Sequence, residues 1–184
     1  MNKLAIVVAA AAMVLALAGC ASNAASGAAS SASSSSARAA SVGLANPWTK
    51  VATAEEAAKG AGLDGFTVPA EVVIGDVTAK DPAFSCMEGI AQADYSAGAV
   101  GFTVRKGKGV SGQAFTGDYN NYAETWVQDV YGTEVECSGK EKGVANLATW
   151  QANGFVYALY CIGLSGEDFG IPEAGLADIV VSVK

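Results

Sequence analysis

Short apolar stretches separated by glycine-rich turns recur from residue 72 onwards, and this series limits the fold more than any other feature. Residues 98–105 alternate, with Val100, Phe102 and Val104 on one side of the expected strand and polar residues on the other. Such alternation predicts a strand with one buried face. Similar strands are expected at 72–77, 86–95, 122–130, 133–138, 143–151 and 154–162. Short strands joined by tight turns predict an antiparallel sheet of about seven strands.

A helix is expected before the strands. Thr53 followed by Glu56 forms a capping box, in which each side chain bonds backbone N–H groups at a helix start. Gly60 and Gly62 are expected to end this helix. Its small-residue face consists of Ala57, Ala58 and Ala61.

A second helix is expected at the end of the chain, from Glu173 to Val183, after Pro172 in a first-turn position. Its apolar residues at helical spacing are Leu176, Ile179, Val180 and Val183. A final strand over 179–181 is the alternative. The fold class predicted is α+β, a curved antiparallel sheet with an N-terminal and a C-terminal helix packed on it.

The pairing of the last strands can also be predicted. An Asn-Gly pair between apolar runs is a strong hairpin signal, and a turn centred on Ala152-Asn153 sets Trp150 opposite Phe155. Another hairpin has its tip at 140–142. One face of the sheet then collects Val135, Cys137, Val144, Trp150, Phe155, Tyr157, Leu159 and Cys161. Because the side-chain period of a strand is two, a one-residue slip would invert this assignment.

The opposite face of the last hairpin is also apolar, and something must cover it. Its residues are Leu147, Val156, Ala158, Tyr160 and Ile162. We expect the helix at 53–61 or the helix at 173–183 to pack there. The alternative is an open groove or a partner surface, because large exposed apolar patches mark binding.

Three cysteines follow Cys20, so at most one disulfide forms among them. In the predicted pairing Cys137 and Cys161 flank Val144 two strands apart, roughly 9–10 Å from the strand spacing. A disulfide needs Cα atoms within about 7 Å, so a bridge would involve Cys86, and we favour Cys86–Cys137. The alternative is three buried reduced thiols.

The chain opens with an apolar run from Leu4 to Ala18 after Lys3. This run is shorter than the roughly 20 residues of a membrane-spanning helix, and it is typical of a signal peptide. It ends in Leu17-Ala18-Gly19-Cys20, which resembles the lipobox of bacterial lipoproteins. That resemblance implies a signal peptide over 1–19, a lipid on Cys20 and attachment to the outer side of the cell membrane. An ordinary signal peptide cut nearby is the alternative.

Residues 20–46 and 47–184 differ sharply in composition. After Cys20 the first segment is nearly all Ala and Ser with one charge, Arg38, so it predicts a flexible tether that reaches roughly 30 Å. The second segment is long enough for a single globular domain. Nine basic residues against eighteen acidic ones give this domain a net charge of −9. Phosphate backbones repel such a domain, so no nucleic acid partner is expected.

The sequence predicts no cofactor, no metal site and no catalytic residue. The chain has no histidine, which excludes Ser-His-Asp and Cys-His units. The stretch 105–109 lacks the phosphate-loop pattern and is interpreted as a solvated turn, and 117–122 is interpreted as a turn rather than a calcium loop. The sequence does not exclude a catalytic pair of carboxylates. Glu134 and Glu136 are expected on one solvent-facing side of a strand.

Turn and core motifs of the domain resemble a group of uncharacterised lipoproteins from Gram-positive bacteria. The motifs are Asn46-Pro47-Trp48, Phe66-Thr67-Val68-Pro69, Thr103-Val104-Arg105-Lys106-Gly107, Gly117-Asp118-Tyr119-Asn120 and Ala148-Thr149-Trp150. Related domains occur in anti-sigma-factor-like and lipoprotein-carrier-like extracytoplasmic proteins. The resemblance implies a curved antiparallel sheet with packed helices, and it assigns no catalytic residue.

These observations favour a membrane-anchored extracytoplasmic lipoprotein that is not an enzyme. Its domain is expected to bind a partner in the cell envelope, either a protein or an amphiphile. Two alternatives remain at this point. One is a cell-wall-active hydrolase that uses paired carboxylates. The other is a passive structural module at the cell surface.

Overall fold

The computed structural model describes residues 46–163 and 168–184, which belong to one compact unit. Among the described residues, this unit contains an extensive hydrophobic core. Residues 46–184 therefore form a domain with a core of its own, which is what independent folding requires. The predicted signal peptide, the tether and Cys20 lie outside the described residues.

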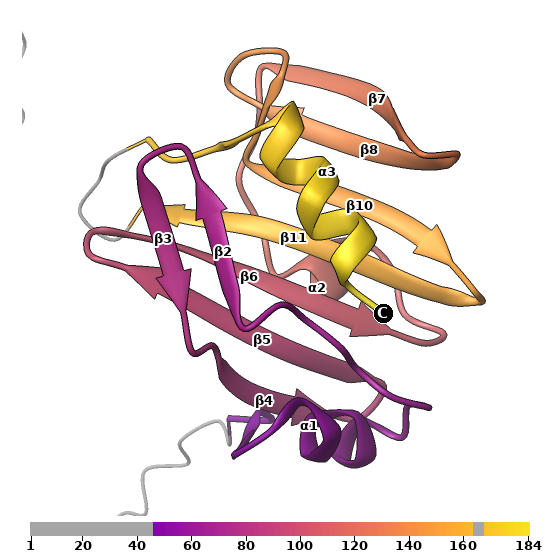
Figure 1. The fold of residues 1–184 in the computed structure, drawn as a ribbon. Helices are drawn as coiled ribbons and strands as arrows, with labels where there is room; N and C mark the ends of the chain where they lie inside the picture. The colour runs from indigo at the N-terminus through magenta and orange to yellow at the C-terminus, as the bar shows by residue number, and fades with distance from the viewer. Residues whose placement is uncertain (1–45, 164–167) are drawn as a thin grey trace, which may run out of the picture. The chain divides into compact units, whose positions relative to one another are not determined.

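The largest element is an antiparallel sheet of eight strands in the order β1-β4-β5-β6-β11-β10-β8-β7 (Figure 1). Its strands are β1 (Thr49–Val51), β4 (Ala83–Met87), β5 (Ile90–Ala97), β6 (Val100–Gly107), β7 (Glu124–Val130), β8 (Thr133–Gly139), β10 (Leu147–Ala152) and β11 (Phe155–Gly163). Two small antiparallel sheets accompany it. They pair β2 (Glu71–Ile74) with β3 (Val77–Lys80), and β9 (Val144–Ala145) with β12 (Ile171–Pro172). The expected α+β class is confirmed, with one strand more in the sheet than expected.

Two of the expected strands are hairpins instead. The stretch 72–77 is divided between β2 and β3 by the turn at Gly75, where φ is 58°. The stretch 86–95 is divided between β4 and β5 by the turn at Gly89, where φ is 77°. Both glycines take the left-handed backbone conformation that a tight turn requires and that glycine adopts without a Cβ clash.

The two expected helices form at the expected places. Helix α1 (Ala54–Ala61) begins at Thr53, whose side chain accepts from the N–H of Glu56 at 3.1 Å, and it ends at Gly62 with φ 70°. Glu56 bonds the N–H of Ala52 rather than that of Thr53. Helix α3 (Glu173–Ser182) follows Pro172, so the alternative of a final strand is wrong. A third helix, α2 (Gly112–Thr116), was not expected.

The main core lies on one face of the large sheet, the first face. Helix α1 packs there on β4 and β5, and α3 packs beside β2 and β7. Figure 1 shows α3 and the β2–β3 hairpin in front of the sheet. The residues that were expected to form the apolar face of this helix are all buried, and the last of them follows the end of α3: Leu176, Ile179, Val180 and Val183.

The hairpin of β10 and β11 differs from its predicted register by two residues. Asn153 and Gly154 form the turn themselves, with φ values of 53° and 78°, so Trp150 lies opposite Tyr157 rather than Phe155. Positive φ at both central residues is the hairpin turn that follows the twist of the strands. Because the shift is two residues and not one, every residue of β10 and β11 keeps its predicted face.

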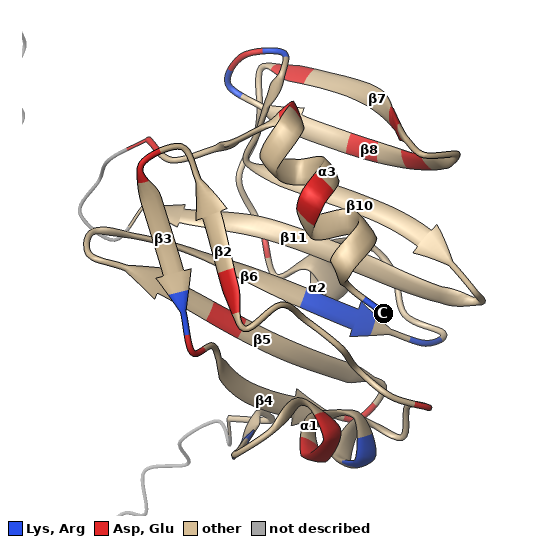
Figure 2. Cartoon of the chain, viewed as in Figure 1, with Lys and Arg blue, Asp and Glu red and all other residues tan. Residues whose placement is uncertain are grey.

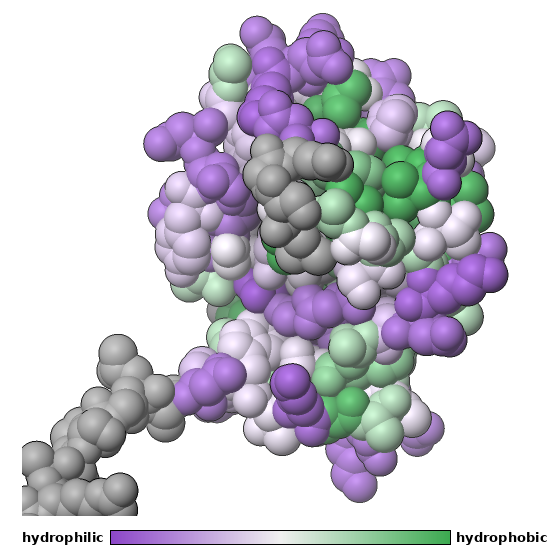
Figure 3. Space-filling view, turned by 90° about the vertical axis from the view of Figure 1, so that its left-hand side faces the viewer, coloured by the Kyte–Doolittle hydropathy of each residue, from purple (hydrophilic) through white to green (hydrophobic). Residues whose placement is uncertain are grey.

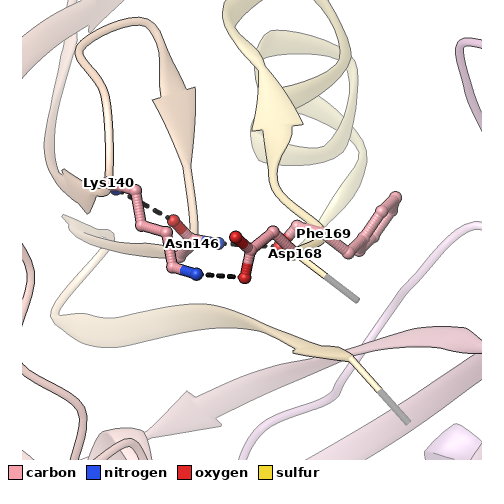
Figure 4. Close-up of polar contacts among 4 residues, drawn as sticks. All are labelled: Lys140, Asn146, Asp168 and Phe169. Carbon is pink, nitrogen blue, oxygen red and sulfur yellow. Dashed lines mark hydrogen bonds and ion pairs between the residues drawn. The ribbon is translucent and has the colours of Figure 1, made fainter. Parts of the chain in front are cut away.

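Val144 departs from the predicted pairing because it leaves the large sheet and pairs with β12. The side chain of Asn146 stabilises this change of sheet through two hydrogen bonds (Figure 4). Its amide donates to the carbonyl of Phe169 at 2.7 Å and accepts from the N–H of Lys140 at 3.2 Å. An exposed ion pair between Lys140 and Asp168 joins the same two segments.

Candidate functional site

The large sheet has a second face, opposite the first, and other elements cover only one half of it. Helix α2 packs on β6 and β11, on the side away from α1 and α3. Its Phe115 is 3% exposed, and it belongs to a small apolar cluster with Ile90 and Ala158. The expectation that α1 or α3 would cover this face is wrong, because the apolar residues of both helices are part of the core on the first face.

Arg105 fixes α2 to the sheet. Its Nε donates to Gln92 at 2.7 Å, and its Nη1 donates to the carbonyl of Phe115 in α2, also at 2.7 Å. The guanidinium carbon lies 4.8 Å from the centroid of the Trp48 ring and 5.2 Å from that of the Tyr160 ring. Burial lowers the pKa of Arg105, but a guanidinium stays charged at any physiological pH.

A short polar chain continues from this cation. The amide of Gln92 donates to Asp94 at 2.7 Å, and the hydroxyl of Thr103 donates to the other oxygen of the same carboxylate at 2.6 Å. The positive charge of Arg105 is therefore balanced by the carboxylate of Asp94, to which it is connected through Gln92. This chain accounts for the buried polar side chains of β5 and β6 on the second face, and we assign it a structural role.

The interpretation of 105–109 as a solvated turn is wrong for 105–107 and confirmed for Lys108 and Gly109, which are exposed. Strand β6 continues to Gly107, and its end carries basic residues (Figure 2). Arg105 and Lys106 are only 6% and 5% exposed. Lys106 lies on the first face, where its Nζ donates to the carbonyl of Gly65 at 2.7 Å and sits 4.1 Å from the centroid of the Phe155 ring. Long basic side chains bury their stems and give their heads backbone or aromatic partners.

The loop after α2 is built around Asp118, which is 5% exposed. Its carboxylate accepts from the backbone N–H of Asn120 at 2.9 Å, from the Asn120 amide at 2.7 Å and from the Tyr122 hydroxyl at 2.5 Å. Burial and the bond to Asp118 raise the pKa of Tyr122, which keeps the hydroxyl a donor. The predicted turn chemistry is confirmed here, because the Asp side chain bonds the backbone two residues on.

Between this loop and the uncovered strands lies a pocket of about 310 Å³, which we name the α2 pocket. Its residues are Gly112, Gln113, Thr116, Asp118, Asn120, Asn121, Tyr122, Thr125, Ser138 and Leu147. Seven of these ten residues carry a hydroxyl or amide group, and Leu147 is the one large aliphatic residue among them. The side chains of Gln113, Asn121 and Thr125 are exposed. Beside Asp118 in the loop, Tyr119 is 70% exposed.

The uncovered half of the second face is polar and acidic rather than an apolar groove. Figure 2 shows acidic residues along β7 and β8. Glu134 and Glu136 are exposed on β8, on the side opposite the buried Val135 and Cys137, as predicted. Neither glutamate lines the α2 pocket, which contains one carboxylate, Asp118.

The cysteines do not form the predicted disulfide. Cys86, Cys137 and Cys161 are free thiols, and four strands of the sheet separate β4, which carries Cys86, from β8, which carries Cys137. Strands lie about 4.8 Å apart, so no bridge can span them. Burial raises the pKa of Cys137 to about 11 and that of Cys161 to about 12, so both thiols are protonated at neutral pH.

Other features of the surface give weaker candidates. A shallow hollow of about 880 Å³ borders α1, between Lys50 and Gly60. Figure 3 shows one side of the molecule, where hydrophilic residues surround a gathering of hydrophobic ones. Within residues 46–163 and 168–184, no three Cys, Asp or Glu side chains are grouped so that they could hold a metal ion. No helix of that part combines the length and apolarity needed to cross a membrane.

Comparison with models of protein families, with curated proteins and with solved structures found no match to this chain. The resemblance to lipoproteins of Gram-positive bacteria therefore stays a prediction. A function for this chain has to be inferred from the chemistry of its own sites.

Proposed function

We propose that this chain is an extracytoplasmic lipoprotein, attached to the membrane through Cys20, whose domain binds a hydroxyl-rich ligand in the α2 pocket. The ligand class is a glycan of the cell envelope. The observation that carries the proposal is the lining of the pocket, where hydroxyl and amide groups converge on a rigid loop.

The chemistry of the lining matches that of a sugar. Each sugar hydroxyl both donates and accepts hydrogen bonds, and amide side chains such as Gln113 and Asn121 offer both functions. The loop is held by the bonds to Asp118, so the pocket orders few groups when a ligand binds, and preorganisation of this kind lowers the entropic cost of binding. The exposed ring of Tyr119 adds an apolar platform with a polar end at the same loop.

The α2 pocket suits the binding of a glycan better than its hydrolysis. Glycoside hydrolysis uses two carboxyl groups that flank the scissile bond. The α2 pocket offers only Asp118, whose two oxygens already accept three hydrogen bonds from Asn120 and Tyr122. An amphiphile is also a poor match to this face, because α2 covers its apolar half and seven of the ten residues that line the pocket beside it carry a hydroxyl or amide group.

The test is a titration of isotope-labelled residues 46–184 with soluble peptidoglycan fragments, followed through backbone amide shifts. We expect saturable shifts at residues 112–125. Gln113→Ala and Asn121→Ala should each weaken binding at least tenfold. Gln151→Ala is the matched control, because Gln151 is exposed on the same face but lies outside the pocket. Shifts that are absent, or that Gln151→Ala abolishes equally, would contradict the glycan proposal.

Membrane attachment is tested separately with the full chain expressed in a bacterial host. Growth with an alkyne-labelled fatty acid should label the chain, and the protein should sediment with membranes. Cys20→Ala should abolish both the label and the sedimentation. A labelled Cys20→Ala variant, or an unlabelled wild-type chain, would contradict the lipid anchor and leave the glycan test unaffected.

A further inference from the structure

Strand β7 lies at one edge of the large sheet, and within the described residues no strand pairs with its outer side (Figure 1). Each of its seven residues lies opposite a residue of β8, and the register runs without a bulge. The opposite edge is β1, which has three residues and carries Lys50. A short edge strand with a lysine resists pairing with other chains, whereas a long regular edge is a template for another strand. The two edges of this sheet therefore differ in how well they are protected.

The outer backbone groups of β7 belong to alternate residues. The β7–β8 hairpin has a two-residue turn, so its closing pair, Val130 and Thr133, exchanges both backbone hydrogen bonds. Bonded and non-bonded pairs alternate along an antiparallel ladder. The N–H and C=O groups of Thr125, Val127 and Asp129 therefore point away from β8, toward the open edge. All three of these residues are exposed.

Two side chains of β7 lack hydrogen-bond partners. The indole Nε1 of Trp126 and the amide Oε1 of Gln128 are buried, and neither atom has a partner in the part of the chain that the structure describes. Buried polar atoms nearly always have a partner, and these two are the exceptions among the described side chains. Both lie on the one long open edge, which indicates that the surroundings of β7 are completed by another chain.

The charge of this edge selects the partner. Asp129 lies directly opposite Glu134, and like charges in such a pair are unfavourable. A basic strand beside β7 relieves this repulsion, whereas a second copy of this chain, with a net charge of −7, adds to it. Residues 124–139 contain no basic residue and four acidic ones (Figure 2), which are Glu124, Asp129, Glu134 and Glu136.

We propose that β7 pairs with an extended basic segment of another protein, which adds a further strand to the eight of the large sheet. The added strand bonds the outward N–H and C=O groups of Thr125, Val127 and Asp129, and strand addition of this kind is a common mode of peptide recognition. On the second face, a basic residue of the segment lies beside Asp129 and an apolar residue beside Val127, which is 64% exposed. The proposal goes beyond glycan binding and does not depend on it.

The test titrates isotope-labelled residues 46–184 with three capped peptides. The first is Lys-Thr-Val-Thr-Lys, the second is Glu-Thr-Val-Thr-Glu, and the third is Lys-Thr-Pro-Thr-Lys, in which proline removes the central N–H. We expect saturable amide shifts centred on 124–130 with the first peptide, and at least tenfold weaker binding of the other two. Binding that is absent at millimolar concentrations, shifts centred elsewhere, or equal affinity for the proline peptide would overturn the proposal.

The decisive variant is Val127→Pro. Because the N–H of Val127 points outward, proline removes no bond to β8, and proline is tolerated at such positions of edge strands. The domain should therefore stay folded while its affinity for the first peptide falls at least tenfold. Val127→Ala is the matched control, since it shortens the side chain and keeps the N–H, and it should bind nearly as tightly as the wild type. Unchanged affinity in Val127→Pro, or an equal loss in Val127→Ala, would contradict pairing through the edge backbone.

Two further arrangements keep the test decisive. If Val127→Pro does not fold, the proline peptide tests the same hydrogen bond on the wild-type domain. Concentration-dependent shifts at 124–130 without any peptide would assign the edge to a second copy of this chain and overturn the proposal. The titration contains no glycan, so its failure leaves the proposal for the α2 pocket standing, and the reverse also holds.

Discussion

At the scale of single residues, Arg105 and Lys106 show how neighbours in a strand can have unrelated roles. Adjacent side chains of a strand point to opposite faces, so Arg105 lies under α2 and Lys106 lies in the main core. Both are buried, and each charged head finds hydrogen-bond acceptors and aromatic rings. A pair of basic residues beside glycines therefore does not by itself indicate a solvent-exposed turn.

We predict that Arg105→Ala lowers the free energy of unfolding by about 3 kcal/mol, because it leaves Gln92 and the carbonyl of Phe115 without their donor and removes a packed side chain. Urea unfolding measures the change. Lys50→Ala is the control, since Lys50 is exposed, and it should change the value by less than about 0.5 kcal/mol. Equal stabilities of the Arg105 variant and the wild type would contradict the role given to this cation.

At the scale of elements, α1 lies close to the sheet because its packing face consists of alanines and a glycine. Gly60 is inside the helix and does not end it, contrary to the sequence prediction. A Cβ built on Gly60 would lie 2.4 Å from the sulfur of Cys86 on β4. Glycine is less favourable than alanine in a helix by about 1 kcal/mol, so this close approach is the reason for its presence.

We predict that Gly60→Ala destabilises the domain by about 1–3 kcal/mol through overpacking against Cys86. In a Cys86→Ala background, where the sulfur is gone, the same substitution should be neutral or stabilising because alanine favours the helix. A double-mutant cycle of urea unfolding measures the coupling. Equal effects of Gly60→Ala in both backgrounds would show that the contact does not decide the choice of glycine.

At the scale of the whole molecule, the sheet separates two environments. Its first face is covered by α1, α3 and the β2–β3 hairpin and contains the main core. Its second face is covered by α2 over β6 and β11 and is open over β7 and β8. The groups with raised pKa values include Cys137 and Cys161 and three tyrosines, Tyr95, Tyr122 and Tyr157.

These groups predict that stability decreases in alkaline solution. An unfolded thiol ionises near about pH 8.5, whereas the folded pKa values of Cys137 and Cys161 are about 11 and about 12. Between those limits the unfolded state binds fewer protons, so stability falls as pH rises, by about 1.4 kcal/mol per pH unit for each thiol. Urea unfolding at pH 7 to 10.5 measures the slope. Cys137→Ala should reduce it, and a stability independent of pH over this range would contradict the burial of these groups.

Much of the secondary structure could be predicted because the signals are local. Thr53 begins α1, Pro172 precedes α3, and the alternation along β6, β8 and β11 assigns residues to faces correctly. The register between β10 and β11 could not be fixed, because a shift of two residues leaves every face unchanged. The α2 pocket was visible only as turn chemistry around Asp118, and nothing in residues 124–130 showed that this strand lies at an edge of the sheet.

The sequence by itself determined where α1, α3 and most of the strands form and which side of each is apolar, since these depend on contacts a few residues apart. Only the tertiary structure decided the strand order, which separates Cys86 from Cys137, and the cover of the second face by α2. It also left β7 at an open edge of the sheet. The physical reason is that segments far apart in the chain compete for the same apolar surfaces, and the outcome depends on how all of them pack at once.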